Sequence, residues 1–567
     1  MIISRNKIYS TLYFLGFALI LLGVFFFLGM YEEFFSGPKG IHFMRQTDSL
    51  SFASQYFNHG YDFFEPRLFN LKNIDGRAAC EFPITYYLTA LLFNVFGKST
   101  AILKLIHLII IYLGTYYIFR LSNLILKNIS ISILICLFFF TSTIFNYYSF
   151  NYLPDSSALG FNFIGLYYIF KYLEFNKTNS LITSFIFFTL GGLIKVTYAI
   201  NPISIIIYSI FIQLFKKQDP TRIIQQKKII LIGGLSVLVI CIWNFYMLQY
   251  NSIYYSHSFN TDILPIWNLT KDEIIEVWDV MINYWNSEYF NHPSMIIIVL
   301  MSLIQIGFNK KSSKQLLGIS FILLLGCITY FILFYSQFKD HDYYILAFFP
   351  LLVLIIINGT KTILNFDASI SLIMFVLYFI LFYIQVRYNY YYTIVFFPLV
   401  FVFVINRAKI LFGYKVNTKV KTHVIVFLLL LPIIVDGIDY SRIQLNRRYN
   451  IAISETSRTS LLINKNLDVI TNLNLPHNSK FIVAPEPTQN GAFFFLDKEG
   501  WTIDKIKDVN NENISALQNK GANFLLLVDQ DNLIDHIKFG KTLYEGIDGF
   551  KIIKLQSTKP KNNPTSR

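Results

Sequence analysis

Long apolar runs separated by short polar segments dominate the pattern of hydrophobic and polar positions along the chain. A helix needs about 20 mostly apolar residues to cross the ~30 Å hydrocarbon core of a bilayer. By this measure the pattern predicts about thirteen membrane spans, near residues 9–30, 101–125, 131–149, 156–173, 180–195, 198–215, 229–249, 294–308, 315–336, 343–358, 368–386, 392–406 and 423–437. The first run follows Arg5 and Lys7 without a small-residue cleavage site, so we expect a retained helix rather than a signal peptide.

Composition agrees with an α-helical polytopic membrane protein. Of the 567 residues, 54% are hydrophobic and only 14% are charged, whereas a soluble protein would carry roughly 25% charged residues. The formal net charge is +14, but no motif in the chain supports nucleic-acid binding. The four cysteines form neither a disulfide framework nor a CxxC metal site.

The distribution of Lys and Arg predicts the orientation. With the N-terminus in the cytoplasm, the cytoplasmic loops include 216–228, 309–314 and 407–422, which carry five, three and five basic residues. The opposite loops, 150–155, 250–293 and 337–342, contain only Lys271 and Lys339. Short cytoplasmic loops are rich in Lys and Arg in membrane proteins. The asymmetry therefore predicts a cytoplasmic N-terminus and an outer C-terminal region, which we assign to a bacterial inner membrane.

Three stretches lie outside the predicted bilayer spans. We expect residues 1–437 to form the transmembrane domain, with outer loops at 31–100 and 250–293, and residues 438–567 to form a small outer α/β domain. Within that domain the pattern predicts strands at 480–484, 523–529 and 550–555, and helices near 454–473, 503–508 and 513–520. No internal repeat is visible, which disfavours an inverted-repeat transporter.

The first outer loop contains two predicted helices. In the first, the segment that begins at Arg45 leads into Ser51–His59 and ends before Gly60. Its apolar positions Leu50, Ala53 and Phe57 recur at helical spacing, so the helix is amphipathic, with Asp48 near its start.

The second predicted helix of this loop follows the tripeptide Glu81-Phe82-Pro83. It covers Ile84–Phe96 and ends at Gly97. At about fourteen residues it is too short to span a bilayer, and its aromatic side chains are typical of the membrane interface.

These motifs, in this order, resemble the GT-C glycosyltransferases. The resemblance rests on Arg45-Gln46-Thr47-Asp48, on Pro66-Arg67, on Glu81-Phe82-Pro83 before a Tyr-rich helix, and on the aromatic stretch 494–501 of the tail. It is strongest to the branch of protein O-mannosyltransferases and the bacterial aminoarabinose transferase of lipid A. It implies an enzyme that transfers a sugar from a polyprenyl-phosphate donor to a glycan, lipid or protein acceptor on the outer face, among membrane lipids.

The resemblance implies that Asp48 is the base for the acceptor hydroxyl in an inverting transfer and that Glu81 lines the same cavity. Another role is open for each residue. Asp48 could cap the helix, because Asp is a favoured N-cap residue. Glu81 could be a first-turn acid favoured by the helix dipole. Either role of Asp48 would lower its pKa and keep the carboxylate ionised.

One departure from the family pattern concerns the leaving phosphate. The aminoarabinose branch has Glu-Lys-Pro where this chain has Phe82, so another cation must contact the phosphate. The candidates are Arg45, Arg67, Lys195 and His341, and we expect Tyr344 beside His341 to hydrogen-bond phosphate or sugar. A charge such as Lys195 at membrane depth is functional by default, although it could instead snorkel to the surface.

No metal or other cofactor is expected, because a single His with neighbouring acids is a poor zinc site.

Two competing functions remain open at this point. A transporter or flippase of lipid-linked saccharides would not be an enzyme and predicts repeat symmetry with polar residues inside the bundle. A polysaccharide polymerase would usually lack the outer domain. The chain instead concentrates its polar groups in the outer loops, which favours the glycosyltransferase.

Overall fold

The computed structural model describes residues 2–215, 220–259, 263–365, 418–450, 457–476, 478–529, 539–546 and 548–556. The predicted spans near 368–386 and 392–406, and most of loop 407–422, lie outside these residues. The chain forms two compact units. The first consists of Met1–Phe34, Lys104–Trp243 and Asp262–Asn446, and the second of Phe35–Leu103, Asn244–Thr261 and Arg447–Arg567.

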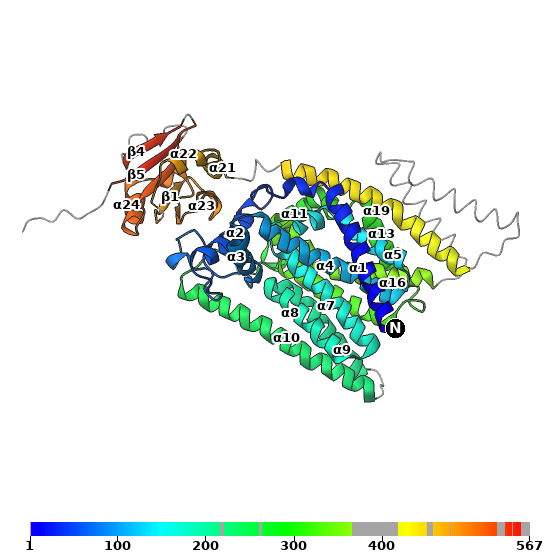
Figure 1. Ribbon diagram of the computed structural model, residues 1–567. Coiled ribbons are helices and arrows are strands. Elements are labelled where there is room, and N and C mark those ends of the chain that lie inside the picture. Colours follow the sequence, from blue (N-terminus) through cyan, green and yellow to red (C-terminus); the bar gives the residue numbers. More distant parts are fainter. Residues whose placement is uncertain are drawn as a thin grey trace, which may run out of the picture. The chain divides into compact units, whose positions relative to one another are not determined.

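The first unit is helical (Figure 1). Its α-helices are α1 (Ile2–Phe27), α4 (Ala101–Leu126), α5 (Ile129–Phe138), α6 (Thr143–Ser149), α7 (Asp155–Phe175), α8 (Thr178–Ile194), α9 (Ile200–Phe215), α10 (Pro220–Ile253), α11 (Lys271–Val280), α12 (Asn286–Tyr289), α13 (His292–Gly307), α14 (Lys314–Leu333), α15 (Gln337–Asp340), α16 (Phe349–Leu364) and α19 (Thr418–Asn450). Shorter turns are η1 (Met30–Glu33), η3 (Phe139–Thr141), η4 (Val196–Ala199), η5 (Ile266–Asn268), η6 (Met281–Trp285) and η7 (Asp342–Phe348). Helix α7 packs along α8, α9 packs on α14, and α13 packs on α16.

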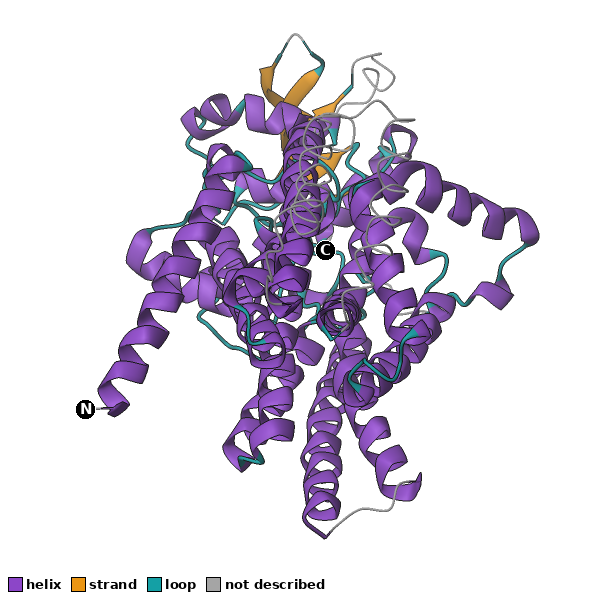
Figure 2. Cartoon of the chain, turned by 90° about the vertical axis from the view of Figure 1, so that its right-hand side faces the viewer, coloured by secondary structure: helices purple, strands orange, loops and turns teal. Residues whose placement is uncertain are grey.

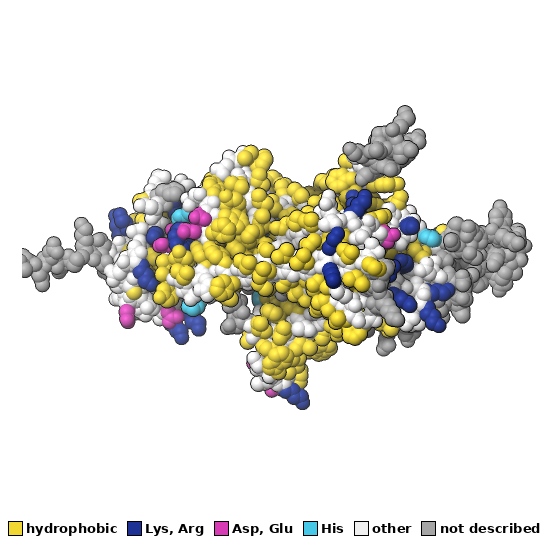
Figure 3. All heavy atoms as spheres, turned by 90° about the horizontal axis from the view of Figure 1, so that it is seen from below, with side chains coloured by type: hydrophobic (Ala, Val, Ile, Leu, Met, Phe, Trp, Pro, Cys, Tyr) yellow, Lys and Arg dark blue, Asp and Glu magenta, His cyan; other side chains and the backbone are white. Residues whose placement is uncertain are grey.

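Several of these helices are long and apolar enough to cross a membrane. Within the described residues there are five such spans, or up to seven if two sharply bent pairs each count as one. The bent pairs are α5–η3 with α6, at 86°, and α11–α12 with α13, at 94°. On the face that carries α10, hydrophobic side chains cover a broad surface (Figure 3), and Leu231, Leu235 and Leu238 are exposed there. Because such a surface requires an apolar environment, the chain is a multi-pass membrane protein.

The second unit combines helices of the segment Phe35–Leu103 with the only sheet among the described residues (Figure 2). Its helices are α2 (Phe43–Asn58), α3 (Ile84–Phe96), α21 (Arg458–Lys465), α22 (Leu467–Asn472), α23 (Gly491–Leu496) and α24 (Asn511–Asn519), with the turns η2 (Ile74–Gly76) and η8 (Ile506–Asp508). Helix α2 packs against both α3 and α23.

The sheet has the order β2-β1-β3-β5-β4. Its strands are β1 (Phe481–Ala484), β2 (Gly500–Thr502), β3 (Phe524–Val528), β4 (Gly540–Glu545) and β5 (Phe550–Leu555). Strand β1 is parallel to β2 and β3, and β5 is antiparallel to β3 and β4.

The segment around residues 69–71 extends this sheet at the β2 edge. The amide of Leu71 donates to the Gly500 carbonyl at 2.7 Å, and the amide of Gly500 donates to the Phe69 carbonyl at 3.2 Å. Leu71 packs into the apolar core on one side of the sheet and Phe69 into the core on the other. This segment therefore contributes to the apolar cores on both sides of a sheet that is distant in sequence.

The helix and strand predictions compare well with this structure. The predicted helix Ile84–Phe96 is confirmed, and it ends where Gly97 adopts a φ of 78°, a conformation that glycine reaches without strain. The three predicted strands are confirmed as β1, β3 and β5 within a residue at each end. Strands β2 and β4 and helix α23 were not predicted.

Candidate active site

Helix α2 buries an unusual number of polar side chains. These are Gln46, Thr47, Asp48, Ser49, Ser51, Ser54 and Gln55. Buried polar groups cost free energy unless they are hydrogen-bonded, and most of these side chains have partners outside the helix. The Gln46 amide donates to the Ile41 carbonyl at 2.9 Å, and the Ser49 hydroxyl lies 3.2 Å from the Tyr86 hydroxyl on α3. The helix therefore presents a polar face within the second unit.

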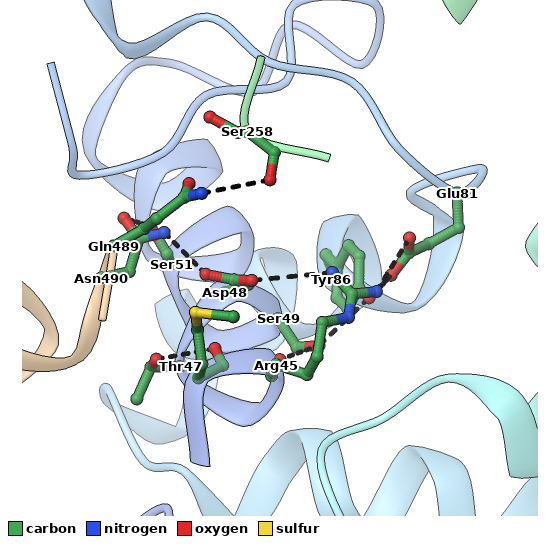
Figure 4. A network of polar contacts seen from close by, with 11 residues as sticks. Arg45, Thr47, Asp48, Ser49, Ser51, Glu81, Tyr86, Ser258, Gln489 and Asn490 are labelled. Atoms are coloured by element: carbon green, nitrogen blue, oxygen red, sulfur yellow. Dashed lines mark hydrogen bonds and ion pairs between the residues drawn. The ribbon is translucent and has the colours of Figure 1, made fainter. Parts of the chain in front are cut away.

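Asp48 lies on this face and is 3% exposed. Its Oδ1 accepts a hydrogen bond from Asn490 Nδ2 at 2.8 Å, and its Oδ2 lies 3.6 Å from Nη1 of Arg45 (Figure 4). The N-cap of the helix is His42, which precedes Asp48 by more than a turn. The helix-cap interpretation of Asp48 is therefore wrong, because the helix begins earlier than its apolar spacing suggested.

Burial raises the pKa of Asp48 to about 6, against the opposing effects of the Arg45 charge and the Asn490 hydrogen bond. Our expectation that the pKa would be lowered is wrong. It assumed a solvated cap, whereas a desolvated carboxylate loses the hydration that favours its charged form. A carboxylate with this pKa is still mostly ionised at pH 7 and can accept a proton near neutral pH.

Glu81 has the opposite electrostatic environment. Burial alone would raise its pKa, but the Arg45 charge and a hydrogen bond donated by the Tyr86 hydroxyl lower it to about 2. Nη2 of Arg45 lies 3.2 Å from Oε1 and 3.4 Å from Oε2 of Glu81. Helix α3 has no acid in its first turn, because its N-cap is Pro83. The first-turn interpretation of Glu81 is therefore wrong.

Arg45 thus lies between two carboxylates whose pKa values differ. When the environments of two neighbouring acids drive their pKa values apart, the acid with the higher pKa can exchange a proton and the other stays charged. Here Asp48 is the group that can exchange a proton, and Glu81 is the permanent counter-ion of Arg45. The Arg45 guanidinium also lies over the Phe259 ring, 5.2 Å from its centroid.

A second charged cluster in the same unit contains Arg67. Its Nη2 lies 2.9 Å from Glu65 Oε2, and Nη2 of Arg77 lies 3.0 Å from the same oxygen. The two arginines are neighbours in an isolated antiparallel β-bridge. Sequence reasoning missed Arg77. Because Arg67 and Arg77 are close in sequence, a tight loop between them could have indicated that both side chains belong to one cluster. Two guanidinium groups on one carboxylate leave a net positive charge that suits a phosphate.

The other predicted residues form a group in the first unit. Nζ of Lys195 lies 3.1 Å from Asp155 Oδ1 and lies over the rings of Tyr343 and Tyr344, 4.9 and 4.8 Å from their centroids. The His341 ring centroid is 5.1 Å from that of Tyr344. The structure therefore brings Lys195, His341 and Tyr344 together.

Two acids of this group were missed by sequence reasoning. Asp155 pairs with Lys195, and the buried Asp342 accepts a hydrogen bond from the Tyr148 hydroxyl at 2.6 Å. Among the residues that the structure describes, no three His, Cys, Asp or Glu side chains are grouped as a metal site.

Comparison with known proteins agrees with this architecture. The sequence model of the family described as dolichyl-phosphate-mannose-protein mannosyltransferase matches residues 81–246. The fold is similar to that of ArnT from Cupriavidus metallidurans in the apo state, with a TM-score of 0.58 and 10% identity over 96% of this chain and 98% of that one. The structure of the same protein bound to undecaprenyl phosphate matches with a TM-score of 0.55, at the same identity and coverage.

No curated protein sequence matches the chain. The family match begins at Glu81 and covers α3 to most of α10, and the shared fold extends over nearly the whole chain. Together with the helical membrane unit and the small C-terminal sheet, these similarities show that the chain has a fold of the type found in ArnT, and that residues 81–246 match the mannosyltransferase family model.

Proposed function

We propose that this enzyme transfers a sugar from a polyprenyl-phosphate donor to an acceptor hydroxyl, with inversion, and that Asp48 is the base. The observation that carries the proposal is the buried Asp48 carboxylate, with its pKa raised to about 6, beside the Arg45–Glu81 ion pair. The family description that matches residues 81–246 names a dolichyl-phosphate sugar donor. One structure of similar fold is bound to undecaprenyl phosphate, which supports a lipid-phosphate donor.

In the proposed step, the oxygen of the acceptor hydroxyl attacks the anomeric carbon of the donor. The bond between that carbon and the phosphate oxygen breaks, and the lipid phosphate leaves with the bonding electron pair. The hydroxyl proton passes to Asp48, which later releases it to water. Oδ1 of Asp48 accepts from Asn490 at 2.8 Å, whereas Oδ2 has the longer contact with Arg45, at 3.6 Å, so we assign the proton to Oδ2.

The leaving phosphate needs cationic stabilisation. In the second unit, Arg67 and Arg77 supply two guanidinium groups that share the single counter-ion Glu65, and in the first unit Lys195 lies between Asp155 and two tyrosine rings. Within the second unit we assign phosphate contacts to Arg67 and Arg77. Within the first unit, taken by itself, we propose a phosphate contact for Lys195 and sugar or phosphate hydrogen bonds for Tyr344 and His341. Arg45 stays with its two carboxylates. The reaction needs no cofactor, and we expect transfer to persist in EDTA.

We place the protein in a bacterial inner membrane, with its N-terminus in the cytoplasm and residues 438–567 outside. The Lys and Arg asymmetry of the loops supports this orientation. A cysteine introduced at Asn511, on the exposed start of α24, should react with a membrane-impermeant maleimide on intact cells or on spheroplasts. Labelling that requires permeabilisation of the inner membrane would reverse the orientation.

The function is tested by mass spectrometry of the surface glycans of a deletion strain. We expect one sugar to be missing from a lipid, protein or polymer, and to return with the wild-type gene but not with Asp48→Asn. The same sugar, linked to undecaprenyl phosphate, then serves as donor for the purified enzyme in detergent. A deletion strain with unchanged surface glycans, together with a purified protein that does not bind undecaprenyl phosphate, would refute the proposal.

A further inference from the structure

The side-chain amide of Asn490, just before α23, is held in one orientation. Its Oδ1 accepts from the backbone amide of Asn70 at 3.1 Å and from the Ser51 hydroxyl at 3.4 Å. Ser51 in turn accepts from the amide of Phe69 at 2.8 Å, so its own proton is available for Asn490. Because donors surround the amide oxygen, the amide nitrogen must face Asp48, to which it donates at 2.8 Å (Figure 4).

The loop that carries Asn490 is held by a buried carboxylate. Glu486 is fully buried, and one of its oxygens accepts from the hydroxyls of Ser457 and Ser460, both at 2.7 Å. The other oxygen accepts from the backbone amide of Thr488 at 2.9 Å and from its hydroxyl at 2.5 Å. Four donors on one buried carboxylate fix the loop rigidly, because breaking any of them would leave a buried charge under-solvated.

Packing next to Asn490 leaves little freedom. A Cβ at Gly491 would approach Thr488 Oγ1 at 2.4 Å, Phe43 Cε1 at 2.7 Å and Ser460 Oγ at 2.8 Å. Phe43 is the first residue of α2, and its ring stacks on that of Phe495 in α23. The C-terminal loop and the helix that carries Asp48 are therefore packed in contact next to the Asn490 amide.

We propose that Asn490 is a positioning residue of the active site, which fixes the orientation of the Asp48 carboxylate by holding its Oδ1 and which helps to keep that carboxylate ionised. This inference rests on the proposed function of Asp48. The C-terminal part of the chain then contributes to catalysis by supplying a hydrogen bond to the base, 442 positions away in sequence, rather than by contacting the reacting atoms.

The surroundings of Asp48 explain why a neutral donor matters there. The titratable groups around it are Arg45 on the same helix, Glu81 before α3, and Tyr86 on α3, which is hydrogen-bonded to Glu81. Arg45 is shared with Glu81, and the Glu81 charge opposes ionisation of Asp48. The C-terminal loop contributes the uncharged amide of Asn490, which donates without attracting a second carboxylate.

The test measures the protonation of Asp48 without turnover. Infrared difference spectra of the full-length protein in detergent, taken over a pH series as wild type minus Asp48→Asn, isolate the carboxyl stretch of this residue. In Asn490→Ala, loss of a hydrogen bond to the charged form should move the midpoint upward by about one pH unit. Asn490→Asp keeps the oxygen that accepts from Asn70 and Ser51 but sets a second carboxyl group against Asp48, and should move the midpoint further upward.

Two further readouts separate positioning from folding. Both variants should bind undecaprenyl phosphate as the wild type does, and Asn490→Ala should restore less than about a tenth of the missing glycan to the deletion strain. Gln489→Ala is the matched control, since the neighbouring side chain donates only to the Ser258 carbonyl. It should leave the infrared midpoint and the glycan unchanged.

An unchanged midpoint in both Asn490 variants, or full glycan restoration by Asn490→Ala, would overturn the inference. If Asn490→Ala does not fold, Asn490→Asp decides by its midpoint alone. Failure of the proposed function is a separate result: Asp48→Asn would then restore the glycan fully, whereas the infrared midpoint would still respond to Asn490.

Discussion

Two charged clusters of the second unit have opposite compositions. Around Asp48 one guanidinium serves two buried carboxylates, whereas around Glu65 one half-buried carboxylate serves two guanidinium groups. The first has a formal charge of one negative unit and the second of one positive unit when every group is ionised. The first is suited to accepting a proton and the second to binding an anion.

Burial also distinguishes the two charged clusters. The side chains of Asp48 and Glu81 are only 5% and 6% exposed, while that of Glu65 is 35% exposed. A buried acid with insufficient positive charge nearby has a raised pKa, and a half-exposed acid next to two arginines stays ionised. The comparison predicts that changes in the first cluster alter the chemical step and that changes in the second alter donor binding.

The largest expected effect is that of Asp48→Asn. The amide has nearly the same size and can keep a polar contact with Asn490, but it cannot accept the acceptor's proton. Turnover should fall by about 10²- to 10⁴-fold, as is typical of general-base loss, while undecaprenyl phosphate should still bind. Rates with the undecaprenyl-phosphate sugar and lipid binding by the same preparation provide the check. Undiminished turnover would remove Asp48 from the mechanism.

Removal of the central cation of the acidic cluster should mainly reduce stability. Arg45→Met leaves two buried carboxylates without their shared partner, and loss of one partner of a buried ion pair costs about 3–5 kcal/mol. Thermal unfolding in detergent at pH 7 should show a clearly lower midpoint than the wild type. Arg67→Met, in the half-exposed cluster, is the matched control and should lower it much less. Equal losses would mean that burial does not distinguish the clusters.

In the cationic cluster the expected effect is on donor affinity. Arg67→Ala and Arg77→Ala should each weaken the binding of undecaprenyl phosphate about tenfold or more, because a charge-assisted hydrogen bond to phosphate contributes about 1.5–3 kcal/mol. Lys195→Ala in the first unit should act in the same direction. Turnover at saturating donor should change less than affinity, and titration of the lipid followed by tryptophan fluorescence measures the difference.

A control for this prediction is Lys72→Ala. Lys72 is in the same loop, but its ammonium group pairs with the exposed Asp504. Wild-type affinity for undecaprenyl phosphate in Arg67→Ala, Arg77→Ala and Lys195→Ala alike would remove the phosphate assignment from all three residues.

Local structure was predictable wherever one periodic pattern determines it. Helix α3 is flanked by Pro83 and Gly97, and strands β1 and β3 are continuous apolar runs, so their limits follow from sequence. Strand β2 covers only Gly500–Thr502, and the largely exposed strand β4 shows no alternation. Strand β2 depends on pairing with β1 and with Asn70, and β4 depends on pairing with β5, so neither strand is determined by its own residue pattern.

The residues of the candidate site also differ in how far the sequence predicts them. Asp48 and Glu81 belong to short motifs, so a resemblance to known sequences was enough to select them as candidate site residues. Asn490 is a polar residue in a loop, and its importance comes from a hydrogen bond to a helix 442 positions earlier. The direction of the Asp48 pKa shift also escaped prediction, because it depends on burial by segments that are remote in sequence.

The smallest expected effect is a shift in the pH dependence of the reaction. With a pKa raised to about 6, Asp48 becomes protonated as the pH falls, so kcat/KM should decline below about pH 6. Glu81→Gln removes a negative charge that raises this pKa and frees Arg45 to approach Asp48. Both changes favour the ionised carboxylate, so the acidic limb should move to lower pH by about one unit. Glu65→Gln is the counterpart in the cationic cluster, and Glu65 is not among the groups that shift the pKa of Asp48. Glu65→Gln should leave the acidic limb of the pH profile in place even if it changes donor affinity. A shift of equal size in Glu65→Gln and Glu81→Gln would show that the acidic limb reflects overall charge and not the pairing around Asp48.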